Sequence, residues 1–366
     1  MDEPGPLEQL LVAVAAMADG VLWPAAHDVD GADAIPRSHL DALADLGLFS
    51  MVVPADAGGM GLTPPEVRAV LRRLGGGCGT TAFAFAQHQG AVAALATTDN
   101  GELRRRWLGP LCDRTLAGTA FAHVRRSGPP AVRAERRAGG WRFHGEAPWA
   151  TSWGLAEVFT VAAQSDDGSL VWALVPGHEQ LGLAAGDPME LVVFDAAVTV
   201  RLRFDGYEVS DDAVLAVDDL DRWRRRDRRA AARPNPLAVG VGDRALAELA
   251  LVEPAVADAA GAGWTEAVAD AEAAALAVDG DSDDVAAIAG VRTRTVLAVQ
   301  RLTTALLAAS GGRGAARGHP AQLLARQALF YVVQAQNADG RAATLEAVVP
   351  RTRTPSADVV GASPDG

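Results

Sequence analysis

Apolar positions in the first 115 residues recur with the spacing of helices, and helix-starting and helix-ending residues accompany them. Residues 8–28 predict an amphipathic first helix, and Pro64-Pro65 starts a later helix that Gly75-Gly76-Gly77 stops. Residues 80–97 are almost all small and apolar, a composition typical of a helix that is buried on most sides. The pattern predicts an N-terminal α-helical domain over residues 1–115.

The period changes to that of strands from residue 116 onward. Two β-rich runs flank Gly139-Gly140, which predicts a hairpin, and further runs at residues 158–163, 170–175 and 198–204 are separated by Asp, Gly and Pro. This pattern predicts an antiparallel β-barrel or sandwich domain over residues 116–225.

Long alanine- and leucine-rich segments follow, with glycines between them. They cover residues 237–260, 265–278, 284–310 and 319–348. We expect a C-terminal four-helix bundle over residues 226–350 and a flexible tail over residues 351–366. The predicted fold class is therefore α+β, in the uncommon order helices, sheet, helices.

The charge composition excludes several kinds of chemistry. All 33 basic residues are arginine, so the chain has no lysine for a Schiff base, a pyridoxal phosphate anchor or a P-loop. The net charge of −13 argues against nucleic acid as the main partner, because phosphate backbones bind cationic surfaces. The one basic cluster, residues 222–229, is interpreted as a solvated connector.

The cysteines, the histidines and the hydropathy pattern argue against further classes of protein. Cys78 and Cys112 are too few for a disulfide framework, an iron–sulfur cluster or a structural zinc site, and the seven histidines show no metal-ligand spacing on a helix. The first residues are acidic, unlike a signal peptide, and no uninterrupted apolar run reaches the roughly 18–20 residues of a membrane span. We expect a cytoplasmic protein with reduced thiols, no metal site and no membrane span.

Residues 146–154 are a candidate ligand site. Two tryptophans, Trp149 and Trp153, and two hydroxyls, Thr151 and Ser152, stand between one strand and the next. An indole face beside hydroxyl and backbone donors suits a flat heteroaromatic ligand, which needs stacking and hydrogen bonds at its polar edge. The alternative is that the tryptophans only cover the end of a β core.

Two further features have both a chemical and a structural interpretation. In Gly311-Gly312-Arg313-Gly314, glycines allow the backbone to approach a phosphate and the arginine supplies hydrogen-bond donors, but a plain interhelical turn has the same composition. His88 lies in an apolar helix, where burial would lower its pKa. It is either a satisfied core histidine or a catalytic one.

Several motifs, in this order, resemble the acyl-CoA dehydrogenase superfamily. Residues 43–48 (LADLGL) and 53–62 (VPADAGGMGL) are similar to the family's "L…LGL…VPE..GG.GL" opening, and residues 80–95 resemble the buried helix that follows it. Residues 143–152 resemble the "G.K.WITN" segment, and residues 202–209 resemble the "L.FD.V.VP" strand. The resemblance covers roughly residues 20–350 and implies the family's helix–sheet–helix fold.

The resemblance also implies an FAD site between the β domain and the C-terminal helices, in a homodimer or tetramer that acts on an acyl-CoA-like small molecule. Trp149 would pack on the isoalloxazine, and Thr151 would hydrogen-bond near its N5 edge. The glycine turn would approach the dinucleotide from a neighbouring subunit. The implied cofactor residues are Phe121, Trp149, Thr151, Ser152, Gly311, Gly312 and Gly314.

The family's flavin- and substrate-binding loop and its catalytic base are both altered. The loop should follow Phe121, but the chain reads His123-Val-Arg-Arg-Ser-Gly there and lacks most of the family's hydroxyl and acidic groups. The family's glutamate stands nine residues after the arginine of an "RDA…YEGT" helix, which here is Arg326, and that position is Ala335. An alternative family position falls near Ala232. Losing a positioned base costs roughly 10²–10⁴-fold in rate, and His88 is the remaining catalytic candidate.

Three functions fit these observations. The leading hypothesis is an atypical FAD-dependent oxidoreductase that acts on a CH–CH group of an acyl thioester or a related acyl substrate. The second is a non-catalytic partner subunit of a hetero-oligomeric acyl-CoA dehydrogenase. The third is a flavin-dependent monooxygenase of the same fold, although Gln334 stands where such enzymes have a C-terminal histidine.

Overall fold

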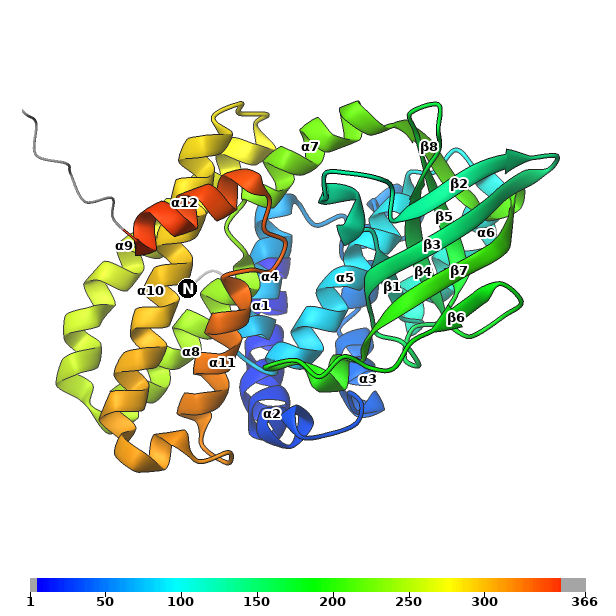
Figure 1. The fold of residues 1–366 in the computed structure, drawn as a ribbon. Helices are drawn as coiled ribbons and strands as arrows, with labels where there is room; N and C mark the ends of the chain where they lie inside the picture. Colours follow the sequence, from blue (N-terminus) through cyan, green and yellow to red (C-terminus); the bar gives the residue numbers. More distant parts are fainter. Residues whose placement is uncertain (1–4, 350–366) are drawn as a thin grey trace, which may run out of the picture.

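The computed structural model describes residues 5–349, which follow the predicted order of helices, sheet and helices (Figure 1). The predicted tail, residues 351–366, lies outside this range. The N-terminal helices are α1 (Pro6–Met17), α2 (Trp23–Asp30), α3 (Arg37–Asp45), α4 (Pro64–Gly75), α5 (Gly79–Ala96) and α6 (Gly101–Asp113). The strands are β1 (Ala117–Ala120), β2 (Val132–Arg137), β3 (Gly140–Thr151), β4 (Val158–Gln164), β5 (Ser169–Pro176), β6 (Leu183–Ala185), β7 (Thr199–Ser210) and β8 (Val214–Asp219). The C-terminal helices are α7 (Leu220–Ala232), α8 (Pro236–Val252), α9 (Pro254–Asp279), α10 (Val285–Ser310), α11 (Pro320–Tyr331) and α12 (Ala338–Val348).

The strands form one eight-stranded sheet in the order β6-β7-β3-β2-β4-β5-β8, with β1 paired to β4 beside this path. Most pairs are antiparallel, and the predicted hairpin joins β2 to β3. Two pairings are parallel, β1 with β4 and, at a single position, β2 with β4, so the predicted antiparallel domain is mainly, rather than entirely, antiparallel. Parallel strands are joined by long crossover connections. The alternation of polar and apolar residues within a strand does not show which strands pair or in which direction.

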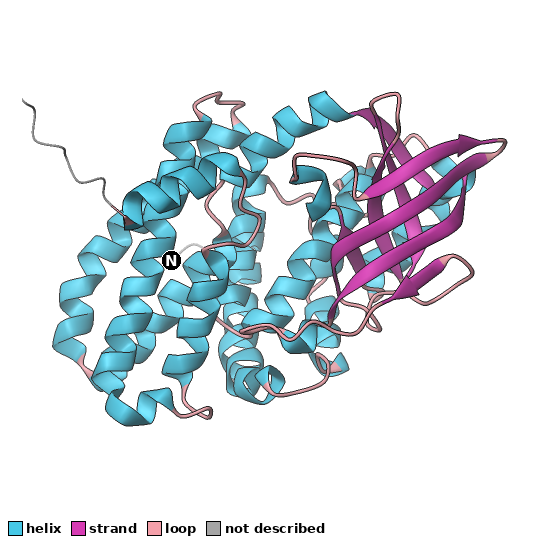
Figure 2. Cartoon of the chain, viewed as in Figure 1, coloured by secondary structure: helices cyan, strands magenta, loops and turns pink. Residues whose placement is uncertain are grey.

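Helix α5 lies between the sheet and the C-terminal bundle (Figure 2). Its side chains are buried around most of the helix, and it contacts β1, α4, α6 and α8, which confirms the helix predicted to be buried on most sides. A single hydrophobic cluster contains residues from the N-terminal helices, the sheet and the bundle. The domain divisions near residues 115 and 225 therefore remain predictions from sequence.

Helix boundaries in the C-terminal part differ from those expected. Pro254 shortens the first bundle helix, as a proline within residues 237–260 predicts: that helix ends at Val252, and Pro254 begins α9, because proline is tolerated in the first turn of a helix. Gly261 and Gly263 do not interrupt α9, so the break expected there was wrong. The segment predicted as one helix over residues 319–348 divides into α11 and α12, and the arginine cluster forms helix α7.

A continuous helical stretch, Pro6–Asp30, is long and apolar enough to cross a membrane by length and composition alone, although polar residues interrupt its apolar run. Val14 and Leu22 in this stretch are fully buried against the rest of the chain. The Arg244 guanidinium lies 4.7 Å from the centre of the Trp23 ring. In this fold the stretch therefore covers the helical core.

Helices α4 and α8 cross with their backbones in contact. A Cβ atom placed on Gly240 would lie 2.1 Å from the carbonyl oxygen of Arg72 and 2.7 Å from the backbone nitrogen of Gly76, so only glycine fits there. The Arg72 guanidinium binds both carboxylate oxygens of Asp243 beside this crossing, at 2.6 and 2.8 Å. This contact joins the N-terminal helices to the bundle.

Candidate functional site

Trp149 projects outward from the sheet because of a β-bulge. In the pairing of β3 with β7, two residues, Pro148 and Trp149, stand opposite the single residue Arg201. Ala147 and Ala150 on either side are fully buried, whereas Trp149 is 41% exposed. Trp149 thus presents an indole face to the surface, as a ring-stacking role requires.

Thr151 and Ser152 lie inside the protein. The Thr151 hydroxyl is 3.1 Å from the Thr199 hydroxyl, and both residues are buried. Ser152 has a φ of 81°, its backbone N–H donates to the carbonyls of Ala197 and Val198, and its buried hydroxyl has no hydrogen-bond partner. Neither side chain reaches the surface that Trp149 faces.

Phe121 belongs to a cluster of aromatic rings from three elements. Its ring centre lies 5.5 Å from that of Trp172 in β5 and 6.2 Å from that of Trp223 in α7, and the two tryptophans are 6.0 Å apart. The Arg125 guanidinium lies 5.2 Å from the Phe121 ring centre and binds both carboxylate oxygens of Asp227. This ion pair ties α7 to the loop after β1.

A cavity of about 1010 Å³ lies next to this aromatic cluster. It extends between the C-terminal end of α5, strands β1, β4, β5 and β8, and helix α7. Its lining includes the three aromatic rings and four threonines, among them Thr119 and Thr160, but not Trp149, Thr151 or Ser152. Small-molecule sites are concave and mostly apolar with a few polar groups, so this cavity is the candidate substrate site.

Three residues of the cavity lining, Trp172, Trp223 and Thr160, were not predicted from the sequence. Trp223 was a visible signal, since it is the one aromatic residue within the arginine cluster and is 7% exposed in α7. Trp172 and Thr160 lie within ordinary β-rich runs, where nothing in the local pattern distinguishes them.

His88 is wholly buried in α5, and both of its ring nitrogens are engaged by backbone groups. The Ala117 N–H donates to Nδ1 at 3.1 Å, and Nε2 is 3.3 Å from the Phe49 carbonyl oxygen, which leaves the proton on Nε2. Burial lowers the pKa of His88 to about 4. This geometry supports the interpretation as a satisfied core histidine.

Because the His88 pKa is about 4 in the folded chain and 6.5 without burial, the unfolded chain binds more protons between these pH values. The free energy of unfolding should therefore fall as the pH falls from about 6.5 toward 4, by about 2 kcal/mol at pH 5 from this group. Urea unfolding at pH 7 and pH 5 measures the loss. His88→Asn should reduce the dependence of the unfolding free energy on pH, whereas His178→Asn, at an exposed position, should not. The same loss of unfolding free energy between pH 7 and pH 5 in both variants and in the unmodified protein would contradict this account.

The glycine turn lies at the far end of the bundle from the sheet (Figure 1). Gly311 has a φ of 59°, and a Cβ on Gly311 or Gly312 would meet no atom within 4 Å, whereas Gly314 is buried against Ser310. The turn is therefore open on its outer side, and it follows α10, whereas Trp149 lies in β3.

The two family positions for the base are both alanines, and one buried arginine links the segments that carry them. Arg292 donates hydrogen bonds to the carbonyl oxygens of Ala231 and Gln334, the residues just before Ala232 and Ala335. Burial lowers the pKa of Arg292 to about 10. Ala335 has a φ of 51°, in the turn between α11 and α12.

No group of three or more metal-ligating side chains occurs within residues 5–349. The expectation that the chain has no metal site remains a prediction.

The comparisons with known proteins point to acyl-CoA dehydrogenases and also include a monooxygenase. The family model described as "Acyl-CoA dehydrogenase, N-terminal domain" matches residues 7–115. Benzylmalonyl-CoA dehydrogenase from Aromatoleum aromaticum is 28% identical over 212 residues, which are 57% of this chain and 56% of that protein. These matches support membership of the acyl-CoA dehydrogenase superfamily. The chain spans about half the length of the first curated relatives it matches.

Solved structures share the fold over nearly the whole chain. Butyryl-CoA dehydrogenase from Megasphaera elsdenii has a TM-score of 0.79 at 15% identity and covers 95% of this chain and 100% of its own. Glutaryl-CoA dehydrogenase from Mycobacterium smegmatis, in complex with FADH2, has a TM-score of 0.77 at 17% identity, covering 95% and 96%. Dibenzothiophene monooxygenase from Paenibacillus has a TM-score of 0.76 at 18% identity, covering 95% and 99%. The helix–sheet–helix architecture of the superfamily is thus confirmed.

Proposed function

We propose that the chain is an FAD-dependent oxidoreductase that acts on an acyl thioester or a related acyl substrate. The observation that carries this proposal is the exposed Trp149 indole on the bulge of β3, in a fold that a solved relative shares while holding FADH2. A bound flavin would supply an acceptor for two electrons. The protein would supply the shape of the binding site and would orient the substrate relative to the flavin.

The residues present fit a flavin in part. Trp149 offers a face for stacking, and the open backbone of Gly311 and Gly312 offers close approach for a phosphate. The buried hydroxyl of Thr151 already pairs with Thr199, so any polar contact from this segment comes from neighbouring backbone groups. Because the glycine turn follows α10 whereas Trp149 lies in β3, we propose a homodimer or tetramer in which the turn serves a neighbouring subunit.

The proposal for the flavin site is tested by replacing Trp149. Trp149→Ala should weaken FAD binding about tenfold, because an aliphatic side chain cannot replace the stacking of an indole. Equilibrium dialysis followed by the visible spectrum measures the bound flavin. Trp23→Ala removes an indole that packs on Arg244, remote from β3, and should leave the flavin content unchanged. Equal flavin content in both variants would show that Trp149 has no part in the site.

Oxygenation is the second candidate function, and the alanines at positions 232 and 335 favour it. Neither position carries a carboxylate to remove an α-proton, and a monooxygenase shares the fold. Substrate that bleaches the flavin without oxygen indicates a dehydrogenase, whereas oxygen uptake that requires a flavin reductase indicates a monooxygenase. A protein that stays colourless with added FAD supports the role of partner subunit to a second homologous chain. For each of these functions we propose a cytoplasmic location.

A further inference from the structure

The cavity beside α7 has an aromatic wall assembled from three distant parts of the chain. Phe121 follows β1, Trp172 lies in β5 and Trp223 lies in α7, with ring centres between 5.5 and 6.2 Å apart. The cavity of about 1010 Å³ reaches the upper size of small-molecule pockets. Aromatic walls of this kind favour ligands with flat rings, since ring pairs at these distances attract beyond the burial of apolar area.

One hydroxyl in the cavity lining has no partner. Thr160 is 3% exposed, and its Oγ1 atom makes no hydrogen bond in the chain. The Thr119 hydroxyl, also in the lining, donates instead to the Gln87 side chain at 3.1 Å. A buried hydroxyl without a partner is costly, so a ligand with one polar group at this point would be stabilised.

The charged groups of the lining disfavour anions. Five aspartates and two arginines line the cavity. Three of the aspartates are in ion pairs, Arg136–Asp211, Arg226–Asp218 and Arg125–Asp227. Asp99 and Asp212 are exposed and have no ion-pair partner, and both lining arginines are already paired, so the described lining offers no free cation.

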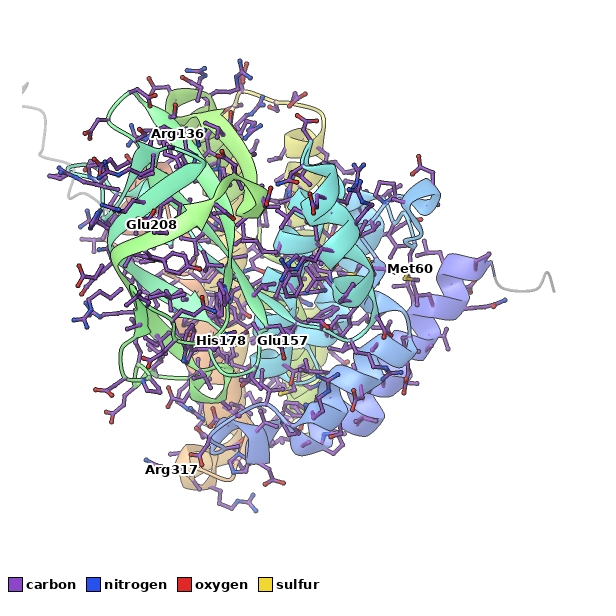
Figure 3. All side chains as sticks on the ribbon, turned by 90° about the vertical axis from the view of Figure 1, so that its right-hand side faces the viewer. Met60, Arg136, Glu157, His178, Glu208 and Arg317 are labelled. Atoms are coloured by element: carbon purple, nitrogen blue, oxygen red, sulfur yellow. The ribbon has the colours of Figure 1, made fainter. Side chains whose placement is uncertain are left out.

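Arg136 marks one end of this charged lining, at the end of the sheet where β2 turns into β3 (Figure 3). Trp141, the second residue of β3, also lines the cavity there, with the Arg136 guanidinium 5.2 Å from its ring centre. The lining thus runs from this paired, solvent-exposed end to the buried hydroxyl and aromatic wall near α7.

We propose that this cavity binds an uncharged, ring-bearing group of an organic molecule and rejects carboxylates and phosphates. The rings would stack on Trp172 and its neighbours, and the polar group would meet the Thr160 hydroxyl. Any anionic part of a larger molecule lies outside the cavity. The identification of this group as the acyl part of a substrate rests on the proposed function, whereas the binding itself needs no flavin.

Isothermal titration calorimetry of the full chain with three small probes tests the proposal. 3-Phenylpropionamide carries a ring and no charge, 3-phenylpropionate carries the same ring and a negative charge, and hexanamide carries neither. We expect the aromatic amide to bind at least tenfold more tightly than either other probe. Equal affinities, tighter binding of the carboxylate, or no binding of the aromatic amide at millimolar concentration would overturn the proposal.

Variants test the rejection of anions and the preference for rings separately. Asp99→Asn combined with Asp212→Asn should bring the carboxylate within about threefold of the amide without weakening the amide, because the repelling charges are gone. Trp172→Leu should weaken the aromatic amide at least tenfold. Trp107→Leu is the matched control, since Trp107 packs in the same hydrophobic cluster but does not line the cavity. Equal losses in the two tryptophan variants, or an unchanged preference in the double variant, would also contradict the proposal.

The visible spectrum, which reports bound flavin, distinguishes a failure of this proposal from a failure of the proposed function. A protein that binds FAD but none of the probes refutes the ligand class alone. A colourless protein that binds the aromatic amide refutes the flavin proposal alone and supports the cavity site.

Discussion

Gly240→Ala should destabilise the protein by about 3 kcal/mol or more, the largest effect on stability that we expect from a single methyl group. The added Cβ would lie 2.1 Å from the Arg72 carbonyl oxygen and 2.7 Å from the Gly76 nitrogen, which are backbone atoms that cannot rotate away. Relief would require α4 and α8 to separate, with loss of the Arg72–Asp243 ion pair beside the crossing. Thermal unfolding followed by circular dichroism measures the effect.

The matched control is a glycine in the neighbouring helix. Gly263 lies within α9, is exposed, and has no atom within 4 Å of an added Cβ. Gly263→Ala should therefore stabilise the protein by up to about 1 kcal/mol, because alanine favours the helix over glycine. Equal changes in melting temperature for the two variants would mean that α4 and α8 do not meet as closely as described.

Ala335→Glu should raise the rate of flavin reduction by 3-phenylpropionyl-CoA by roughly 10²–10⁴-fold, if the chain binds FAD and acts on acyl thioesters. A carboxylate at this position would restore a base for the α-proton. The Arg292 hydrogen bond to the preceding carbonyl, that of Gln334, holds this turn in a defined place. Anaerobic stopped-flow measurement of flavin bleaching gives the rate.

The control for this variant is Ala335→Gln, which has the same shape and no basic oxygen. Because Ala335 has a φ of 51°, both substitutions carry the same backbone strain, and any difference between them reports the carboxylate. A glutamate variant no faster than the glutamine variant would contradict the dehydrogenase proposal. Oxygen uptake with reduced flavin in the unmodified chain would then support the monooxygenase.

Much of the fold was predictable because its signals are local. The small apolar residues of α5 and the glycines of the β2–β3 hairpin each act within a few positions along the chain, and both elements form where expected. The helix boundaries near Pro254 were less predictable. A proline either ends one helix or begins the next, and only the packing of α8 and α9 against α10 decides which.

The candidate site was predictable only in part. Local sequence singled out Trp149 as a residue beside a strand end, and it is exposed there. The same segment placed Thr151 among the ligand candidates, but its hydroxyl pairs with Thr199, which is 48 residues away in the chain. Such a contact depends on how β3 and β7 align, and the pattern of a single strand does not contain that register.

By itself, the sequence determined the order of helices and strands, the lack of lysine chemistry and the absence of a glutamate at position 335. Each of these is a property of residue identity or of short-range periodicity. The tertiary structure alone decided the burial of Thr151 and Ser152, the parallel pairing of β1 with β4, and the cavity that Phe121, Trp172 and Trp223 border. Those features arise from contacts between segments far apart in the chain, and the free energy of such contacts depends on the packing of the whole fold.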